Sequence, residues 1–510
     1  MNKSSPIKKS HKGKTKLPFI IPKKAALWVL VAVSCALIAA LVLNIRAGYY
    51  LPNHLDEWQH LGLARNLVET GQLLQKNPYY SDVQQYNPEP GFTIFTAATW
   101  VLLNDPLYYA AIMPAIFSAW GALMVYILTR KITGSATAGL YALLLYGGIR
   151  SNVNILGEWF YTPMNLALPL TYATLLLMIR ALYDDDKKAY VSAAITAAAV
   201  VLIHPPSALA ILASFALAIA AEPSKIKSRK MAAIILLPAA IGLVLLVFYA
   251  EMKGGGINFI LNAFQFSAEW GTINFPHNPF TFYGIGMSML AALGAIILLK
   301  KKTILPVLFA AFPIAVSYVY IDANIAFFIP FQRAIYLSAV GLVPLTAVGL
   351  DALIKAASDF VGRALTGGKP SLTQKMLPLL AVVIVLYVSF DGYYNVPKEF
   401  SVYLSANPYD VDALRALDGA AKQKVVLTDP WSSAAVYPIT GGYVVAMRTG
   451  KLWGRNYTAT SNFYNNHDCQ YQTNFMRTYD VSYLISKQAN TCGFKEIYSN
   501  RGNHVYEVKR

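Results

Sequence analysis

The sequence predicts an α-helical, multi-pass membrane protein with a small α/β domain at its C-terminal end. Of its 510 residues, 56% are hydrophobic and only 14% are charged, which excludes an ordinary soluble protein. Up to position 391, the apolar residues form runs close to the length that crosses a bilayer. The polar tail 392–510 instead has the alternating patterns of strands and amphipathic helices.

These observations divide the chain into three parts. Residues 1–24 form a basic tail, residues 25–391 a membrane domain, and residues 392–510 a separate α/β domain that is long enough for a core of its own. The membrane domain contains about eleven candidate spanning helices. They cover residues 25–45, 107–129, 135–149, 160–182, 189–204, 206–221, 231–250, 281–299, 303–320, 334–356 and 375–391.

Basic clusters predict the orientation in the membrane. Residues 1–24 carry eight lysines and no acidic residue, which places the N-terminus in the cytoplasm. Alternation of the spans then puts five more basic segments on the cytoplasmic side, at residues 130–131, 187–188, 225–230, 300–302 and 363–375. The net charge of +17 therefore reflects membrane topology, and we expect a cell-membrane protein without a nucleic-acid partner.

The same orientation places the C-terminal domain outside the cell. The first apolar run, residues 25–45, is long enough to span and has no clear cleavage site after it, so it predicts an anchor. In the tail, Val411, Leu414 and Leu417 have helical spacing. Strands are expected at residues 424–428, 443–447, 481–485 and 504–508. Cys469 and Cys492 also lie in this tail, where an oxidising environment permits a disulfide between them.

The first outer loop, residues 46–106, predicts two short helices. In the first, residues 55–70, apolar residues recur at helical spacing up to a stop signal at Thr70-Gly71. The second, residues 91–103, is apolar but too short to cross the membrane. A crossing there would also reverse the orientation of the later loops. We therefore expect it to be half-inserted at the membrane surface.

Two adjacent acids, Asp56 and Glu57, begin the first of these helices. A cap at Asn53 with an acid in the first turn would account for one of them, at about 1 kcal/mol. It does not account for two acids beside His54 and His60. The functional alternative is a carboxylate that accepts a proton from an acceptor hydroxyl or that binds a divalent ion.

This arrangement resembles the C-type, membrane-embedded glycosyltransferases. That superfamily includes protein O-mannosyltransferases, lipid A aminoarabinose transferases and the catalytic subunits of oligosaccharyltransferases, which carry an acidic motif soon after the first span. Residues 87–92, Asn-Pro-Glu-Pro-Gly-Phe, resemble their Pro-Pro-Gly-Tyr-type motif ahead of a short surface helix, although Glu89 interrupts the paired prolines. Residues 104–106, Asn-Asp-Pro, then lead into a long span, as in the family.

The resemblance implies transfer of a sugar from a polyprenyl-phosphate donor to a glycan, lipid or protein acceptor at the outer membrane surface. Asp56 and Glu57 would be catalytic, and His54 and His60 would bind substrate beside them. Inversion at the anomeric carbon follows if displacement is a single step. Arg333, at the outer start of a span, resembles an arginine that many members keep there, and it would contact the lipid phosphate. The alternative for Arg333 is snorkelling to the interface.

Three further outer residues are candidates for substrate contacts. Arg150 ends a span and could bind the phosphate instead. Glu158 matches a second acid that members place in this loop, where it could join Asp56 around Mg²⁺ or Mn²⁺, or be a solvated loop acid. His204, before two prolines, could touch substrate or could belong to a helix-breaking turn. The third outer loop, residues 251–280, has the glycine and aromatic content of a mobile cover and contains Glu269 and His277.

Two alternatives to an active transferase remain open. A catalytically inactive relative that binds a lipid-linked sugar or a partner would keep the same fold. A transporter or flippase is less favoured, because such proteins place ionisable residues deep in their spans and often have inverted repeats, and neither feature is evident here.

Overall fold

The computed structural model describes residues 23–46, 49–73, 77–81, 87–103, 106–151, 155–223, 229–252, 256, 258, 261, 278–323, 325, 327–366, 372–390, 404–447 and 456–508. Each predicted apolar stretch contains a helix. These helices are α1 (Lys23–Ile45), α4 (Pro106–Thr133), α5 (Ala136–Gly147), α6 (Pro163–Asp184), α7 (Lys187–Ile203), α8 (Pro205–Ala221), α9 (Arg229–Met252), α12 (Ile285–Lys300), α13 (Leu305–Ala323), α14 (Phe331–Thr366) and α15 (Leu372–Phe390), with the short α11 (Pro279–Tyr283) before α12.

The membrane character of the bundle is clear from helix length and composition. In the described part of the chain, five helices are long and apolar enough to cross a membrane, namely those at Ala25–Ile45, Leu107–Thr133, Pro163–Asp184, Leu305–Ala323 and Phe331–Arg363. The helical membrane fold is therefore confirmed. The expected number of about eleven crossings stays a prediction, because the apolar stretches of the other helices that could be searched are only 10–17 residues long.

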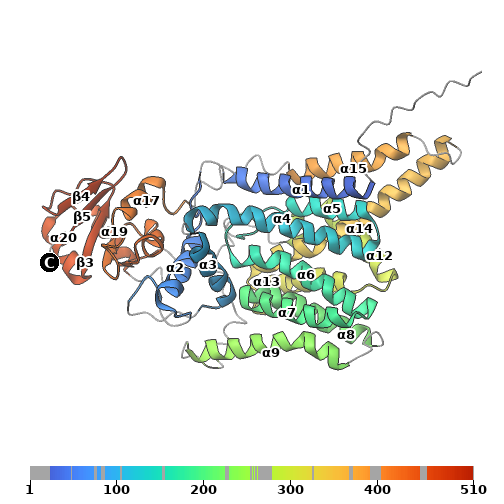
Figure 1. Cartoon of the computed structure of the whole chain (residues 1–510), viewed down its shortest axis with the longest axis horizontal. Helices are drawn as coiled ribbons and strands as arrows, with labels where there is room; N and C mark the ends of the chain where they lie inside the picture. Colours follow the sequence, from blue (N-terminus) through green and yellow to red (C-terminus); the bar gives the residue numbers. More distant parts are fainter. Residues whose placement is uncertain are drawn as a thin grey trace, which may run out of the picture.

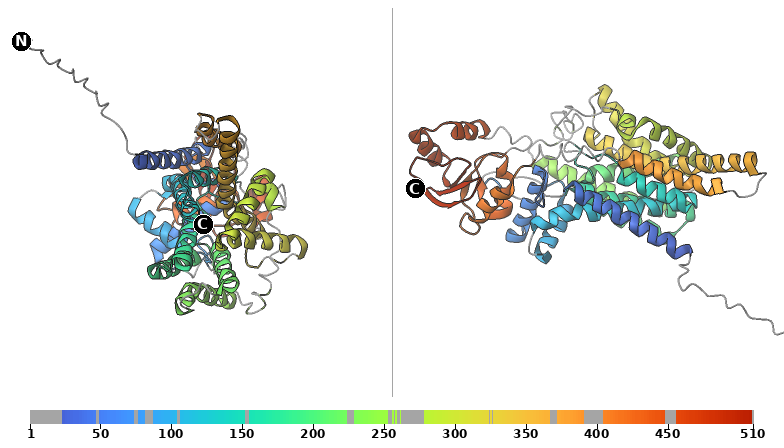
Figure 2. Two further views of the ribbon diagram at one scale, coloured as in Figure 1. Left: turned by 90° about the vertical axis from the view of Figure 1, so that its right-hand side faces the viewer. Right: turned by 90° about the horizontal axis from the view of Figure 1, so that it is seen from above.

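The long helices lie side by side (Figures 1 and 2). Of the five, α14 is the most buried, since 78% of its most apolar 18-residue stretch lies inside the protein. It packs against α12, α13 and α5. A Cβ atom at Gly294 of α12 would lie 1.9 Å from the carbonyl oxygen of Leu345 in α14. Only glycine permits this backbone contact, which is typical of helix pairs in membranes.

The first outer loop forms α2 (Leu55–Thr70) and α3 (Pro90–Leu103), close to the predicted ranges. α2 ends at Gly71 in the left-handed region (φ 68°), as the stop signal predicted. α3 packs against α2 and α7. Its remaining surface exposes Ile94, Val101 and Leu102, which suits a helix lying partly in lipid.

The C-terminal domain is a five-stranded mixed sheet with helices. It comprises α17 (Pro408–Arg415), β1 (Val425–Leu427), the 3₁₀ turn η4 (Ser432–Ala435), α18 (Val436–Thr440), β2 (Tyr443–Val444), α19 (Tyr457–Asn465), α20 (Cys469–Thr478), β3 (Val481–Ser486), β4 (Lys495–Ser499) and β5 (His504–Glu507). The strand order is β2-β1-β3-β5-β4. β1 pairs parallel with β2 and β3, and β5 pairs antiparallel with β3 and β4.

Two features of this domain bear on the sequence predictions. Cys469 and Cys492 form a disulfide, with Cα atoms 5.1 Å apart. The four predicted strands are present, and β4 is a fifth that sequence inspection missed. β4 is an edge strand with mostly exposed side chains, so it lacks the apolar pattern that marks a strand with a buried face.

The C-terminal domain docks on α2 through Tyr79, which is 1% exposed. The Tyr79 hydroxyl lies 2.8 Å from the carbonyl of Ala434 in η4 and 3.0 Å from that of Trp58 in α2. The backbone N–H of Val444 donates to the Tyr79 carbonyl at 3.0 Å. A further hydrogen bond joins the two parts, since Arg65 of α2 donates to the Pro438 carbonyl of α18 at 3.1 Å. Hence α2 is held between the helical bundle and the C-terminal domain.

Figures 1 and 2 show where these parts lie along the bundle. α2, α3 and the C-terminal domain are at one end, and α1 begins at the opposite end. This arrangement agrees with the predicted separation between the basic N-terminal tail and the first outer loop.

Candidate functional site

A capping box fixes the start of α2. His54 is the N-cap residue, and its Nδ1 accepts a hydrogen bond from the Asp56 backbone N–H at 3.1 Å. The Glu57 carboxylate in turn accepts from the His54 backbone N–H at 3.4 Å. The prediction that Asn53 is the cap was therefore wrong by one residue. Capping α2 therefore explains why His54 lies beside the acids.

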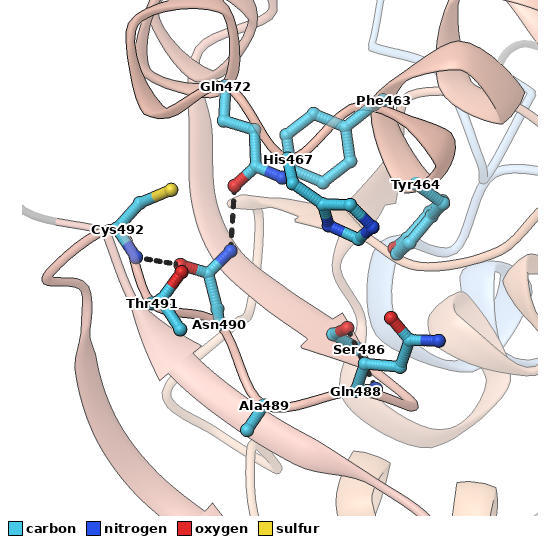
Figure 3. A pocket seen from close by; sticks show the side chains of 10 residues that line it. All are labelled: Phe463, Tyr464, His467, Gln472, Ser486, Gln488, Ala489, Asn490, Thr491 and Cys492. Carbon is cyan, nitrogen blue, oxygen red and sulfur yellow. Dashed lines mark hydrogen bonds between the residues drawn. The ribbon is translucent and has the colours of Figure 1, made fainter.

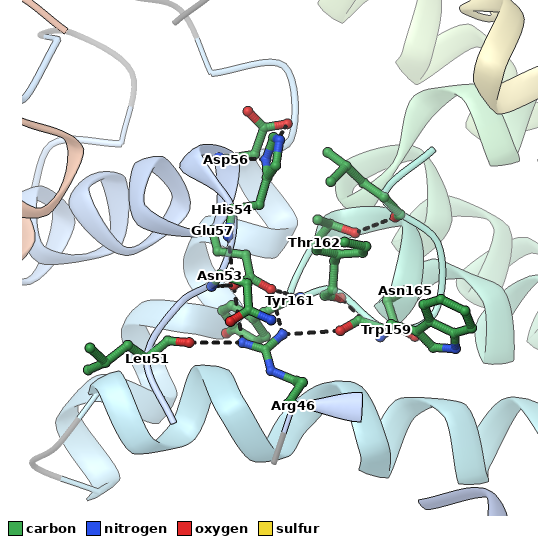
Figure 4. Close-up of polar contacts among 12 residues, drawn as sticks. Arg46, Leu51, Asn53, His54, Asp56, Glu57, Trp159, Tyr161, Thr162 and Asn165 are labelled. Atoms are coloured by element: carbon green, nitrogen blue, oxygen red, sulfur yellow. Dashed lines mark hydrogen bonds and ion pairs between the residues drawn. The ribbon is translucent and has the colours of Figure 1, made fainter. Parts of the chain in front are cut away.

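Glu57 lies at the centre of a buried polar network (Figure 4). Arg46, at the end of α1, donates to its two carboxylate oxygens at 2.8 and 3.2 Å. The backbone N–H groups of Asn53 and Tyr161 donate to the same carboxylate at 2.5 and 2.6 Å. Because Glu57 is 0% exposed, it could reach a substrate only by breaking this network. We therefore assign Glu57 a structural role, in place of the predicted catalytic one.

Asp56 points away from that network in Figure 4. It interacts electrostatically with His60, Glu89 and Arg333, which together with His204 form a different group of polar side chains. His60 is one turn along α2, Glu89 precedes α3, His204 separates α7 from α8, and Arg333 is in the first turn of α14. The His60 Nε2 lies 4.0 Å from the Glu89 carboxylate. Electrostatic interactions join Arg333 to each of the other four residues. We call these five residues the outer-end cluster.

Two polar atoms of the outer-end cluster have no hydrogen-bond partner among the described residues. They are one terminal guanidinium nitrogen of Arg333 and the Nδ1 of His60, and both are buried. An unpaired buried polar group costs about 1–3 kcal/mol. A guanidinium N–H is well suited to a phosphate or carboxylate oxygen. The cluster therefore presents an unused cationic donor beside the Asp56 carboxylate.

Burial changes the protonation of three cluster members. It raises the pKa of Glu89 to about 8, with the Asp56 carboxylate adding to the shift and Arg333 opposing it. It lowers the pKa of His60 to about 4 and that of His204 well below its usual range, and Arg333 adds to both shifts. At neutral pH both histidines are uncharged and Glu89 is mainly protonated, so Arg333 supplies the positive charge of the cluster.

Glu158 and Arg150 lie outside the outer-end cluster. Glu158 is fully buried, and neither of its carboxylate oxygens has a partner in the described part of the chain. Burial raises its pKa well above the usual value and so favours its neutral form. Its backbone N–H and carbonyl bond to Tyr336 and Asn165, which places it in the interior rather than on a solvated loop. Arg150 is exposed after α5. We therefore leave both out of the site.

The predicted divalent-metal pair is not supported by the side chains. Among the described residues, no three His, Cys, Asp or Glu side chains are grouped closely enough to hold a metal ion. Glu158 belongs to the buried interior, whereas Asp56 is about one-third exposed. Within the described part of the chain, Asp56 and Glu158 therefore do not form a donor set for Mg²⁺ or Mn²⁺.

Sequence reasoning missed Glu89 as a site residue, because it was treated as a departure from a proline motif. One signal was available. An acid between two prolines, directly before an apolar surface helix, must enter the membrane surface with the start of that helix. Glu269 and His277, in the predicted cover loop, lie outside the described residues.

Comparison with solved structures places this geometry in a known fold. The chain is similar to the oligosaccharyltransferase AglB of Archaeoglobus fulgidus in complex with an inhibitory peptide and a dolichol-phosphate, at 14% identity over 91% of this chain and 70% of that one, with a TM-score of 0.58. It is also similar to the Archaeoglobus fulgidus enzyme in complex with Zn and sulfate, at 15% identity over 89% and 68%, with a TM-score of 0.55.

A third similar structure matches almost over its whole length. It is ArnT from Cupriavidus metallidurans bound to undecaprenyl phosphate, at 12% identity over 94% of this chain and 98% of that one, with a TM-score of 0.54. No protein-family model matches the chain, and no curated protein does. At these identities the likeness is one of fold, and the chain has the fold of the C-type glycosyltransferases.

Proposed function

We propose that the protein transfers a sugar from a polyprenyl-phosphate donor to an acceptor at the extracytoplasmic face of the membrane. The observation that carries the proposal is the electrostatic interaction of the Asp56 carboxylate with Arg333, whose guanidinium has a buried nitrogen without a partner among the described residues, in a C-type glycosyltransferase fold. The AglB and ArnT structures contain dolichol-phosphate and undecaprenyl phosphate respectively, so both neighbours bind ligands of this donor class.

The cluster supports a single displacement. The acceptor oxygen attacks the anomeric carbon while its proton passes to Asp56. The new C–O bond forms as the bond between that carbon and the phosphate oxygen breaks. The bonding electrons leave with the lipid phosphate, whose charge Arg333 offsets through its free N–H. A displacement in one step inverts the anomeric carbon.

The other members of the cluster would keep the site polar without adding charge. A mainly protonated Glu89 and neutral His60 and His204 can donate or accept hydrogen bonds near the phosphate. Ionised Glu89 would instead repel the phosphate. The Arg46–Glu57 pair would act indirectly, by holding the start of α2 so that Asp56 faces the cluster.

Topology supports an outer-face site. The lysine-rich tail precedes the start of α1, at the opposite end of the bundle from α2 and α3. The C-terminal domain at the cluster's end contains a disulfide, as extracytoplasmic domains often do.

The direct test is incubation of the purified protein with a panel of polyprenyl-phosphate sugars, with and without acceptors, while released polyprenyl phosphate is measured. We expect release with at least one donor and its loss in Arg333→Ala. The exposed Arg150→Ala is the matched control and should keep full release. A catalytically inactive relative would bind a donor without releasing the lipid phosphate. That outcome for every donor would replace our proposal.

A further inference from the structure

The C-terminal domain contains a polar pocket of about 290 Å³ that the proposed reaction does not use. It lies between the segment before α17, the first turn of α17, η4 and the residue after β3. Its lining combines carboxylates, hydroxyls, an amide, an ammonium group and an aromatic ring. The polar and aromatic members are Ser405, Asn407, Asp410, Asp429, Trp431, Ser432 and Lys487.

Two carboxylates of the lining already accept hydrogen bonds from other groups of the domain. Asp410 completes the capping box of α17 and accepts from the side chain of Asn503 at 2.8 Å. Asp429 accepts from the backbone N–H of Trp431 and from the hydroxyl of Ser432. These bonds fix the walls of the pocket before any ligand arrives.

Other lining groups are left over for a ligand. The Ser405 hydroxyl is 3% exposed and has no partner within the described residues. Lys487 is exposed at the rim. A buried hydroxyl without a partner costs about 1–3 kcal/mol, and a ligand in the pocket could satisfy it.

A second pocket in the domain provides a contrast (Figure 3). It holds only about 40 Å³ and is lined by residues of α19, α20 and the loop after β3. Its side-chain amides bond to each other, since Asn490 donates to Gln472 at 2.7 Å. The larger pocket has both the room and the unused donors.

The larger pocket adjoins the end of the bundle that carries the outer-end cluster. The Tyr49 hydroxyl, just after α1, donates to the carbonyl of Ala406, between two lining residues. The Tyr49 hydroxyl also interacts electrostatically with both Glu57 of α2 and Asp410 of the pocket. A ligand in the pocket would therefore lie beside the segment that leads from α1 to α2.

We propose that this pocket binds a neutral sugar residue of a glycan acceptor, a proposal that rests on the proposed function. Hydroxyl-rich ligands need both donors and acceptors, which Ser405, the Asn407 side-chain amide and Lys487 supply. The Trp431 side chain adds an aromatic part to the lining. Two carboxylates against one ammonium disfavour a phosphorylated or acidic ligand. The volume suits one sugar ring rather than a folded protein segment.

The test titrates the purified full-length protein, without donor, with neutral trisaccharides of mannose, glucose and galactose, using calorimetry and ligand-observed NMR. We expect saturable binding of at least one of them. Trp431→Ala and Lys487→Ala should each weaken that binding about tenfold, which corresponds to about 1.4 kcal/mol. Lys487 is exposed, so its replacement should leave folding intact even if Trp431→Ala misfolds. Gln488→Ala, in the smaller pocket, is the matched control.

The outcomes separate this proposal from the proposed function. Binding of a trisaccharide without sugar transfer would support the sugar-binding pocket and contradict the proposed transferase function. Transfer with no saturable binding of the trisaccharides, or with binding unchanged in both variants, would overturn the pocket. Where transfer is measured, Lys487→Ala should raise the KM for the glycan acceptor by a larger factor than it lowers kcat.

Discussion

At the scale of single residues, the two adjacent acids of α2 have different fates. Within the described residues, Glu57 accepts hydrogen bonds from five N–H groups, whereas Asp56 is partly exposed and interacts electrostatically with Arg333. A helical wheel could not separate them, since Arg46 and Tyr161 come from distant parts of the chain. Their contacts with Glu57 exist only after α1 and the loop before α6 meet α2.

Asp56→Asn should abolish sugar transfer. The amide keeps the size of the side chain but cannot accept the acceptor proton, so we expect a rate loss of about 100- to 10,000-fold. The measurement is release of polyprenyl phosphate, with thermal unfolding as a folding check. Asp412→Asn, at an exposed position in α17, should retain the full rate. Undiminished transfer by Asp56→Asn would contradict the assignment of Asp56 as the catalytic base.

Glu89 predicts a pH dependence of stability. Burial raises its pKa to about 8 in the folded protein, from an ordinary value of 4.5. Between these values the folded protein keeps a proton that the unfolded chain has lost, so stability falls as pH rises. Glu89→Gln should remove the part of this pH dependence of stability that Glu89 causes. Thermal unfolding in detergent from pH 5 to 9 measures it, with Glu251→Gln as an exposed control. Equal slopes in the wild type and Glu89→Gln would contradict the raised pKa.

At the scale of elements, sequence pattern was a good guide to helices and a weaker one to their contacts. The limits of α2 follow from its apolar spacing and Gly71, and both appear in the structure. The cap was assigned to Asn53 rather than His54 because either side chain can accept a backbone N–H, and only the backbone turn decides between them. Glu89 escaped notice because its partners lie on α2 and α14, far away in sequence.

Arg46→Ala should destabilise the outer end of the bundle. It leaves the buried Glu57 carboxylate without its cation, which typically costs about 3–5 kcal/mol. We expect a lower thermal midpoint, with transfer lost as α2 loosens. Lys495→Ala breaks an exposed pair with Glu507 and should change the midpoint little. An unchanged midpoint in Arg46→Ala would show that the network is dispensable.

Tyr79→Phe should loosen the C-terminal domain from α2. The change removes the hydroxyl that donates to the Ala434 carbonyl. Because that buried oxygen loses this donor, the docked arrangement should be destabilised by about 1–3 kcal/mol. We expect faster amide hydrogen exchange in α2 and η4 and slower sugar transfer. Gly62→Ala should act in the same direction, because its Cβ would lie 2.8 Å from the Tyr79 hydroxyl. Tyr50→Phe, at an exposed ring, is the control.

At the scale of the whole molecule, the proposal depends on which side of the membrane each end occupies. α2, which carries Asp56 and His60, lies with α3 and the C-terminal domain at one end of the bundle (Figures 1 and 2). A lipid-linked donor can meet an acceptor outside the cytoplasm only if the cluster faces outward. The charge pattern of the loops makes that orientation a specific prediction.

Single cysteines can test this orientation. In a Cys35→Ser background, Arg501→Cys should react with a membrane-impermeant maleimide on intact cells, because residue 501 is exposed in the C-terminal domain. Lys187→Cys, exposed at the α6–α7 turn, should react only after permeabilisation. Cys469 and Cys492 should stay unlabelled until a reductant opens their disulfide. The reverse labelling pattern would place the Asp56–Arg333 pair in the cytoplasm, where an extracytoplasmic acceptor could not reach it.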